Sequence, residues 1–577
     1  MTERKAWSLV ALFFLLHVVL ALPVLTPRLK DIGAFDEAGY VEMGRTLGLH
    51  NLPALNEYPL PALFFALTYI PVHTSDFWFV HSCALGRFLL LLLLWLSAYI
   101  AARQISEIPS PLIMIGLLLL SPATLYLCRN AAHALFTAMS TLALAQLVLF
   151  QRTRALAHVW MASGFVSLAM LSRLGEGAFL FGSLVALSIP LAVSLRRLKA
   201  ALTAVIIPLL IIVGGYMLTY YAVARQSPLG TSKYFYTVFE QGHGQAYADR
   251  FSGLNYYVEG HMESRRLFGT PEDNHYSVFT AIRRNPTAYL KRIPRLARLA
   301  AVTAVTEYGG PLSLWFFLPA AVGCVALLRK NRLLLCTFVL WVSYLVMYVV
   351  LVFQPTHLLL PFPVLFCLTA IGWSALITLS TWQRYLWSAM MLGVVATAVR
   401  RDVSPAFMSS ALVLLIGSWI VWTVVSRYRD PEVLVPSAFV FLLALMLLFR
   451  EGVPSQRPAR LGTAPDERAV LFLQRSFATD APIAAYPASI PSAARLKRVS
   501  LVNGRSELRS EDDLQRWIAD HRLEAIYVDS DLRRFESSVW SLIESQIGTT
   551  LAVAYSSEND EIQILRVDHR RITSSQR

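Results

Sequence analysis

Charged side chains are scarce in this chain, because Asp, Glu, Lys and Arg make up only 15% of its 577 residues. A typical soluble domain carries roughly 25% of them. Cysteine is also scarce, and all five cysteines lie in or at the ends of apolar segments, without a Cys-x-x-Cys pair. This distribution excludes a disulfide framework and a cysteine-based zinc site. The low density of charge argues against a soluble enzyme.

Apolar residues are abundant instead, at 56% of the chain with a mean hydropathy of +0.52. Long runs such as Phe88–Ile100 and Leu333–Phe353 contain almost no charge. Since a bilayer core requires about 20 apolar residues per helix, the sequence predicts a polytopic α-helical membrane protein with about 13 transmembrane helices. The predicted spans lie near 7–25, 79–101, 109–127, 131–150, 157–172, 178–195, 199–223, 311–328, 332–353, 358–380, 384–399, 405–425 and 431–449.

The net charge of +14 follows the topology of a membrane protein and does not indicate nucleic acid as a partner. Lys and Arg gather in alternate short segments between spans, such as Arg196-Arg197 and Arg329-Lys330. Because cytoplasmic loops are enriched in these residues, we expect a cytoplasmic N-terminus and an extracytoplasmic C-terminus in a plasma or inner membrane. The stretch 7–25 lacks a small-residue cleavage motif and is expected to remain as the first helix.

Two domains are expected: a membrane domain over 1–450 and a soluble α/β domain over 451–577. The membrane domain carries two long outer loops, 26–78 and 224–310, which exceed the length of ordinary connections. In the second loop, 277–298 reads as one or two interfacial amphipathic helices, which Pro286 and Pro294 should kink or split. Their basic face either attracts anionic lipid headgroups or lies in water.

The C-terminal segment alternates predicted strands and helices, as a small α/β layer structure does. Helices are expected at 466–475, 510–521 and 537–547, and strands at 482–486, 499–503, 525–528, 551–555 and 561–567. No glycine-rich phosphate loop or nucleophile elbow is present. Asp529 and Asp531 follow a strand and are interpreted as turn residues.

Polar residues at the outer ends of apolar spans are candidates for function, because charge is costly inside a bilayer. The densest group follows the first span, where Asp36, Glu37 and Tyr40 are predicted on a short helix. A second, in-plane helix is expected over 56–70. Further outer-end polar residues are His81, Arg87, Arg129, His133, Arg173, Glu176, Glu307 and His357.

Four short stretches resemble the GT-C superfamily of glycosyltransferases, which includes protein O-mannosyltransferases and lipid A aminoarabinose transferases. Asp36-Glu37 followed by Tyr40 resembles the acidic signature after the first span, and Tyr58-Pro-Leu-Pro61 resembles a Pro-rich stretch before the second. Arg173-Leu-Gly-Glu-Gly177 is similar to a basic-Gly element between the fifth and sixth spans. His357-Leu-Leu-Leu-Pro-Phe-Pro363 is similar to a late Arg-Tyr-x-x-Pro-x-x-Pro element.

The chain departs from the family at three places. Tyr58 stands where some members carry a Lys before a Pro-Pro pair. The stretch Arg129-Asn-Ala-Ala-His133 lacks the aspartate found at the start of the fourth span, and Thr356 or His357 replaces the late arginine. The resemblance therefore implies a divergent member, whose donor recognition or activity differs.

The resemblance implies inverting transfer of a sugar from a polyprenyl-phosphate donor to an acceptor on the outer face. An acceptor hydroxyl needs a carboxylate as general base, and Asp36 is the candidate, with Glu37 orienting it or sharing a divalent cation with it. The leaving phosphate needs positive charge, for which Arg129, Arg173 and Arg87 are candidates. Tyr40, Tyr58, His81, Glu176 and His357 are candidate substrate-binding residues.

Two other functions stay open. A transporter or flippase for lipid-linked or small solutes would span a similar membrane domain, although no internal repeat of the kind common in transporters is visible. A non-catalytic scaffold of the cell envelope would use the C-terminal domain as a partner surface. The sequence identifies neither the sugar nor the acceptor, which can be a glycan, a lipid or a protein, and it does not establish a metal.

Overall fold

The structure, a computed structural model, describes residues 11–400 and 464–571, together with 419 and 423. Within those ranges it leaves out 12–13, 20, 23, 28, 33–36, 49–51, 106–121, 230–232, 251–255, 304–312, 351–356, 358–359, 378–379, 486–488, 501–507, 509, 536 and 558–559. The chain divides into two compact units, described in turn. The first comprises Met1–Leu20, Gly48–Pro61 and Leu89–Val453, and the second Ala21–Leu47, Ala62–Phe88 and Pro454–Arg577.

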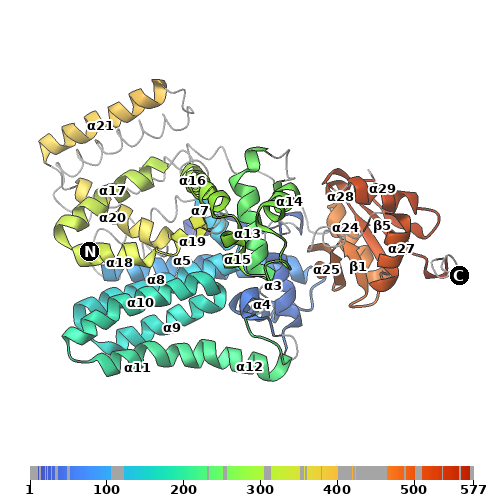
Figure 1. The fold of residues 1–577 in the computed structure, drawn as a ribbon, viewed down its shortest axis with the longest axis horizontal. Helices are drawn as coiled ribbons and strands as arrows, with labels where there is room; N and C mark the ends of the chain where they lie inside the picture. The colour runs from blue at the N-terminus through green and yellow to red at the C-terminus, as the bar shows by residue number, and fades with distance from the viewer. Residues whose placement is uncertain are drawn as a thin grey trace. The chain divides into compact units, whose positions relative to one another are not determined.

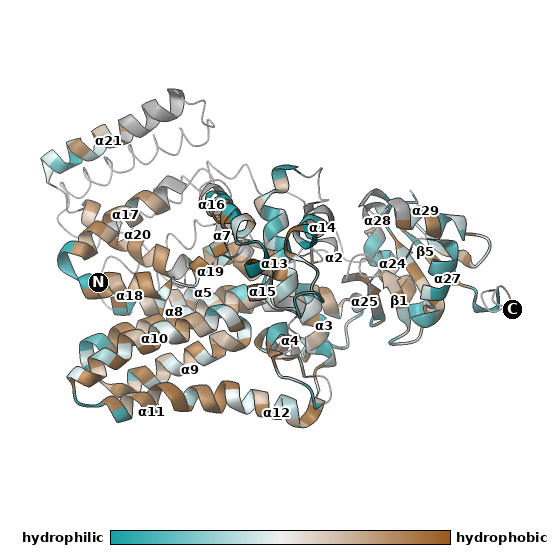
Figure 2. Ribbon diagram, in the orientation of Figure 1, coloured by the Kyte–Doolittle hydropathy of each residue, from teal (hydrophilic) through white to brown (hydrophobic). Residues whose placement is uncertain are grey.

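Long apolar helices make up most of the first unit (Figures 1 and 2). Among the described residues, four helical runs are long and apolar enough to cross a membrane: α5 (Trp78–Ile105), α8 (Ala131–Thr153), α10 (Leu174–Ser194) and Leu198–Ala224. The last of these comprises α11 (Leu198–Leu209), the π-helical turn η3 (Leu210–Gly214) and α12 (Gly215–Ala224). Further helices are α7 (Pro122–Cys128), α9 (Leu156–Ser172), α17 (Ser313–Lys330), α18 (Arg332–Trp341), α19 (Leu345–Val350), α20 (Phe362–Ile377) and α21 (Thr381–Arg400).

These helices coincide with the spans predicted between 79 and 399, apart from the span at 109–127. Of that span, the structure describes only the segment that α7 covers. The predicted spans at 405–425 and 431–449 lie outside the described residues except at 419 and 423, so the total of about 13 stays a prediction. The mainly helical membrane architecture is confirmed.

Polar caps set the start of several helices. The Asn130 side chain accepts a hydrogen bond from the His133 amide at 3.2 Å and begins α8. Asn331 accepts one from the Leu334 amide at 3.1 Å and begins α18. An amide oxygen at this position satisfies a backbone N–H that has no partner within the helix. These caps fix the register in which each helix presents its polar residues.

Helices α17 and α20 cross at two glycines that face each other's backbone. A Cβ added at Gly372 would overlap the carbonyl oxygen of Pro319, and one at Gly323 would overlap that of Leu368. Small residues permit close approach of helix backbones in membranes, where dispersion between packed surfaces drives association. The close packing of α17 against α20 therefore requires glycine at both positions.

We expect Gly372→Ala to lower the free energy of unfolding by at least about 3 kcal/mol, because the helices must separate to admit the methyl group. Gly182→Ala in α10 is a matched control, since nothing lies within 4 Å of its added Cβ. That change should be neutral or slightly stabilising, as Ala favours helix. Chemical denaturation in detergent micelles measures both variants, and equal stabilities would contradict this account of the crossing.

The described residues of the loop after α12 form the α-helices α13 (Lys233–Ala246), α14 (Tyr256–Phe268), α15 (Val278–Arg284) and α16 (Pro286–Thr303) and the short 3-10 helix η4 (Ala248–Arg250). It has an apolar core of its own, formed by Tyr236, Phe239, Phe268, Ala281 and Tyr289. Pro286 begins α16, and the prediction of a break there is confirmed. Pro294, by contrast, lies inside α16 without ending it.

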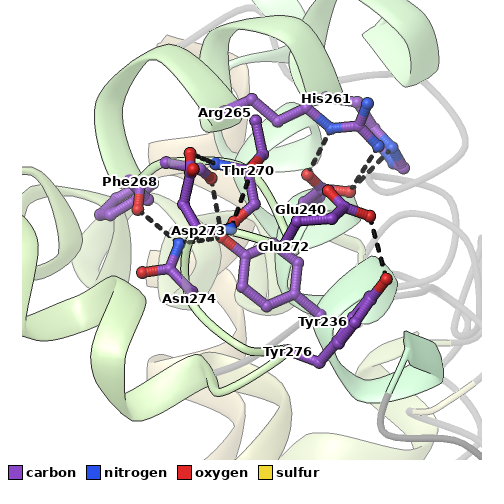
Figure 3. A network of polar contacts seen from close by, with 11 residues as sticks. Tyr236, Glu240, His261, Arg265, Phe268, Thr270, Glu272, Asp273, Asn274 and Tyr276 are labelled. Carbon is purple, nitrogen blue, oxygen red and sulfur yellow. Dashed lines mark hydrogen bonds and ion pairs between the residues drawn. The ribbon is translucent and has the colours of Figure 1, made fainter.

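A polar network joins the helices of this loop, as Figure 3 shows. The carboxylate of Glu240, on α13, accepts a hydrogen bond from Arg265 Nε at 2.7 Å and lies 3.4 Å from His261 Nδ1. Asn274 donates to the Tyr236 hydroxyl at 2.7 Å and to the Phe268 carbonyl at 2.8 Å. These bonds tie the turn after α14 to α13, so the loop is ordered by its own contacts.

Two histidines in this loop make its stability depend on pH. Burial first, and nearby arginines second, lower the pKa of His243 and of His261 from 6.5 to about 4. Each ring faces a carboxylate across the α13–α14 contact: His243 Nε2 lies 3.6 Å from Glu263, and His261 lies near Glu240. Burial also raises the pKa of Glu240. The folded loop therefore holds both histidines neutral.

We expect the loop to open as the pH falls from about 6.5 towards 4. In this range the histidines bind protons in the unfolded loop, whereas they stay neutral in the folded loop. The loss is on the order of 1.4 kcal/mol per histidine for each pH unit in that window. Hydrogen exchange of residues 233–268, corrected for intrinsic rates, measures it. The double variant His243→Gln/His261→Gln should lose most of the pH dependence, and unchanged protection of the original loop down to pH 4 would contradict the prediction.

The second unit contains short helices from segment 26–78 and the start of α5. These are α2 (Leu29–Ile32), α3 (Glu37–Thr46) and most of α4 (Pro59–Tyr69). The helix predicted after Asp36 and the one predicted over 56–70 correspond to α3 and α4. A Cβ at Gly44 of α3 would lie 2.7 Å from backbone atoms of Phe65 and Ala66. Gly44 therefore permits α3 to pack directly on α4.

The C-terminal part of this unit is a five-stranded sheet with the order β2-β1-β3-β5-β4. β1 (Pro482–Ala485), β2 (Lys497–Ser500) and β3 (Ala525–Val528) are parallel, and β4 (Leu551–Ser556) and β5 (Gln563–Val567) are antiparallel. Helices α24 (Pro465–Ser476), α25 (Ser489–Ala493), α27 (Glu511–Asp520), α28 (Ser530–Phe535) and α29 (Ser537–Ser545) connect or flank them. Each predicted element has a counterpart among the described residues, although of the strand predicted at 499–503 only 499–500 is described; α25 and α28 were not predicted.

Contacts within the second unit join the C-terminal sheet domain to segment 26–78. Arg45 of α3 donates to Asp480 at 3.3 Å while it also bonds Glu42. Arg495 donates to the carbonyl of His73 at 2.5 Å, and Gln474 donates to the carbonyl of Asp76 at 3.1 Å. Helices α24 and α25 contact α2, and α25 contacts α3. The helix that begins at Glu37 thus rests partly on the C-terminal domain.

Candidate functional site

Glu37 and Arg87 form a fully buried ion pair in the second unit. Arg87 Nε donates to one carboxylate oxygen at 2.9 Å and Nη2 to the other at 2.5 Å. Nη1 donates to the Val24 carbonyl at 2.7 Å, and both side chains are 1% exposed. Such a bidentate pair holds the two planar groups in one plane and fixes the start of α3 against α5. Arg87, a candidate phosphate ligand, is thus engaged by Glu37.

Asp36, the candidate general base, lies outside the described residues and directly precedes α3. Tyr40 lies one turn into α3 and is 4% exposed. His81 lies near the start of α5, where its Nδ1 is 3.0 Å from the Ser75 hydroxyl. Of the candidates in this unit, the structure therefore brings Glu37 and Arg87 into direct contact.

A second group of buried polar side chains lies in the first unit around Arg173. Arg173 Nε donates to Glu176 at 2.6 Å, and Nη1 lies 3.1 Å from His133 Nε2. The Tyr348 hydroxyl donates to the same oxygen of Glu176. We call Arg173, Glu176, Tyr348, His133 and His357 the arginine cluster. Each of these residues is 6% exposed or less.

The break between α9 and α10 places Arg173 at the centre of this cluster. Its backbone is extended, with φ −155° and ψ 99°, so it ends α9 and precedes α10. A Cβ at Gly177 would lie 2.6 Å from Met170 Cα, which shows how closely the two helices approach at the turn. Glu176 follows within the first turn of α10, three residues after Arg173, where the helix dipole favours a carboxylate.

Aromatic rings close the cluster on its other sides. The His357 ring stacks on Tyr348 with centroids 4.0 Å apart and on His133 with centroids 5.9 Å apart. The Tyr58 ring lies 5.6 Å from the Arg173 guanidinium carbon. A guanidinium has five N–H groups, so Nη1 and Nη2 of Arg173 each retain a donor beyond the bonds described. The cluster therefore offers a fixed cation with donors for an additional acceptor.

The cluster unites three sequence candidates, Arg173, Glu176 and His357, and a fourth candidate, Tyr58, lies beside it; the spacing of these residues did not reveal their contacts. His133, noted as an outer-end polar residue but not as a candidate ligand, is also a member. Tyr344 and Tyr348 were missed, although two tyrosines one turn apart near the end of an apolar span are a detectable signal. Tyr344 packs edge-on against Phe136 at 5.7 Å.

Arg129, the remaining phosphate candidate, lies in the turn between α7 and α8 and is partly exposed. Among the described residues, no group of three or more His, Cys, Asp or Glu side chains is arranged to hold a metal ion. Glu37 alone of the suggested metal pair is described, and it is bonded to Arg87.

No protein-family model and no curated protein matches the sequence. Solved structures do: the chain is similar to ArnT from Cupriavidus metallidurans bound to undecaprenyl phosphate, at 14% identity and a TM-score of 0.55. That match covers 96% of this chain and 97% of the other. The chain is also similar to the oligosaccharyltransferase AglB from Archaeoglobus fulgidus in complex with an inhibitory peptide and a dolichol-phosphate, at 14% identity and a TM-score of 0.46. This match covers 98% of this chain and 74% of AglB.

The similarity to ArnT extends over nearly the full length of both chains, including the small C-terminal sheet domain. The resemblance to GT-C glycosyltransferases is thereby confirmed at the level of the fold. The chain has the GT-C-like fold of a polytopic membrane protein.

Proposed function

We propose that the protein is a membrane glycosyltransferase that takes a sugar from a polyprenyl-phosphate donor and transfers it, with inversion, to an acceptor on the outer face. The observation that carries this proposal is the buried arginine cluster in a fold shared with ArnT, which was solved with undecaprenyl phosphate. A buried guanidinium with free donors suits a phosphate that departs with increasing negative charge. The orientation with the C-terminal domain outside belongs to the same proposal.

In this mechanism Asp36 accepts the proton of the acceptor hydroxyl as its oxygen attacks the anomeric carbon of the sugar. The bond from that carbon to the phosphate oxygen breaks, and the polyprenyl phosphate leaves with the bonding electron pair. Arg173 stabilises the departing phosphate through the N–H groups that Glu176 and His133 do not occupy. Glu176 holds the guanidinium in place, and Arg87 keeps Glu37, next to Asp36, in one orientation.

Binding of undecaprenyl phosphate to the purified full chain tests the proposed donor class. Native mass spectrometry should show retention of the phosphate lipid and not of undecaprenol, which has the same chain without the charge. Arg173→Lys keeps the positive charge but loses the planar guanidinium, which can donate two parallel hydrogen bonds. We therefore expect the Kd of this variant for undecaprenyl phosphate to rise at least about tenfold. Arg196→Lys, at an exposed turn after α10, is the matched control. Equal retention of both lipids would refute a phosphate site.

A further inference from the structure

Helices α15 and α16 each present exposed apolar and basic side chains. We define the basic-apolar face as Phe279, Arg283, Leu290, Lys291 and Arg298. Phe279 is 82% exposed and Leu290 62% exposed, and all three basic residues are exposed. Phe279 and Arg283 are one turn apart on α15, and Lys291 and Arg298 are two turns apart on α16. The spacing places each set along one side of its helix.

The charge on this face is of one sign. From Val278 to Thr303 the sequence contains no aspartate or glutamate. Ion pairs do form next to it, between Arg284 and Asp273 at 3.9 Å and between Arg295 and Asp249 at 3.8 Å. In the described part of the chain, no ion pair includes Arg283, Lys291 or Arg298. Three cations thus face outward beside exposed apolar side chains.

The opposite face of α16 is anchored at the end of an apolar helix. The Tyr289 hydroxyl and Arg292 Nη2 both donate to the carbonyl of Val350, at 3.2 and 3.0 Å. Val350 is the last residue of α19, which follows α18 in a hydrophobic run. An amphipathic helix held at the end of a membrane helix lies at the depth of the lipid headgroups.

The loop that carries this face is already ordered, as the bonds of Glu240 and Asn274 in Figure 3 show. Binding therefore does not require the loop to fold. Exposed Phe and Leu beside Arg and Lys are the side chains that an interfacial surface uses to enter a leaflet of anionic lipid. A soluble acidic partner would account for the cations but not for two exposed apolar residues at the end of a membrane helix.

We propose that the basic-apolar face binds the anionic phospholipid headgroups of the adjacent leaflet and thereby holds the loop against the membrane. The arginine cluster is not part of this surface, so the inference is independent of the proposed catalytic function. The basic residues would bind headgroup phosphates, and Phe279 and Leu290 would enter the acyl boundary.

The test compares the full chain in nanodiscs of phosphatidylcholine with the chain in an equal mixture of phosphatidylcholine and phosphatidylglycerol. Hydrogen exchange of residues 278–303 should slow at least about fivefold in the anionic discs. The triple variant Arg283→Gln/Lys291→Gln/Arg298→Gln should abolish that difference without a change in thermal midpoint. The control Arg475→Gln/Lys497→Gln/Arg522→Gln removes three exposed cations from the C-terminal domain. In this control the difference in exchange between the two kinds of disc should remain.

Equal exchange in both kinds of disc would overturn the proposal and favour a soluble acidic partner. Slowing with a small amount of undecaprenyl phosphate but not with phosphatidylglycerol would also overturn it, because the face would then select the donor lipid. Phe279→Ser/Leu290→Ser provides a second measure, since it should weaken the protection while leaving the charge unchanged. Full protection in that variant would refute the insertion of these side chains.

Discussion

Replacement of Asp36 by Asn is expected to reduce sugar transfer by about 10²- to 10⁴-fold while the protein stays folded in the membrane. The amide cannot accept the proton of an acceptor hydroxyl, although it fills nearly the same volume. Asp36 directly precedes α3, whose first residue, Glu37, is bonded to Arg87, so the substitution leaves that buried ion pair intact. The measurement is the rate at which each protein transfers labelled sugar from a polyprenyl-phosphate donor that the unsubstituted protein accepts.

Glu42→Gln is a suitable control, because Glu42 is a partly exposed carboxylate on the same helix and bonds Arg45. That variant should transfer sugar at nearly the original rate. Full activity of a folded Asp36→Asn variant would eliminate Asp36 as the base. Loss of activity in both variants would instead indicate that α3 tolerates no change of charge.

The second large effect is expected at the ion pair of Arg173 and Glu176. Glu176→Gln leaves the buried guanidinium without its anion, and Arg173→Gln leaves the carboxylate without its cation. Each should lower the free energy of unfolding by about 3–5 kcal/mol, since removal of one partner leaves the other as a buried charge without a counter-ion. The double variant should lose much less than the sum. Chemical denaturation of all four proteins in one detergent gives the coupling free energy.

Tyr348→Phe separates the contribution of the tyrosine from that of the pair, because it removes a single hydrogen bond to Glu176. We expect a loss of about 1.5–3 kcal/mol, the range for hydrogen bonds to charged groups. Additive losses for Arg173→Gln and Glu176→Gln would show that their interaction contributes nothing to stability. In that case the cluster would have to be explained by ligand binding alone.

The local elements were predictable because apolar runs, strand-helix alternation and caps are properties of neighbouring residues. The strand at Ala525–Val528 and the helix begun by Ser510 follow from such patterns. Pro294 does not split the helix, since α16 continues through it to Thr303 on the support of its buried face. The helix at Ser530–Phe535 was missed because Asp529, interpreted as a turn residue, caps it by accepting from the Leu532 amide.

The site was predictable only as a set of isolated candidates. Glu37 and Arg87 are 50 residues apart, and Arg173 and His133 are 40 apart, so their contacts depend on how helices pack. Helical spacing indicates which residues share a face but not which other helix that face meets. The hydroxyl of Tyr348 illustrates the limit: its partner Glu176 lies 172 positions earlier in the chain.

The contact between Arg45 and Asp480 joins residues separated by 435 positions. During synthesis, segment 26–78 emerges long before the domain on which α3 rests. The early helices therefore enter the membrane before the partner of Arg45 has been made. The polar side of α3 lacks this contact until the C-terminal domain has been translated. Contacts between such distant residues form slowly, because much chain must be ordered before they are made. The contacts that support α3 therefore form only after the C-terminal domain has been synthesised, and a chain truncated before Asp480 lacks them.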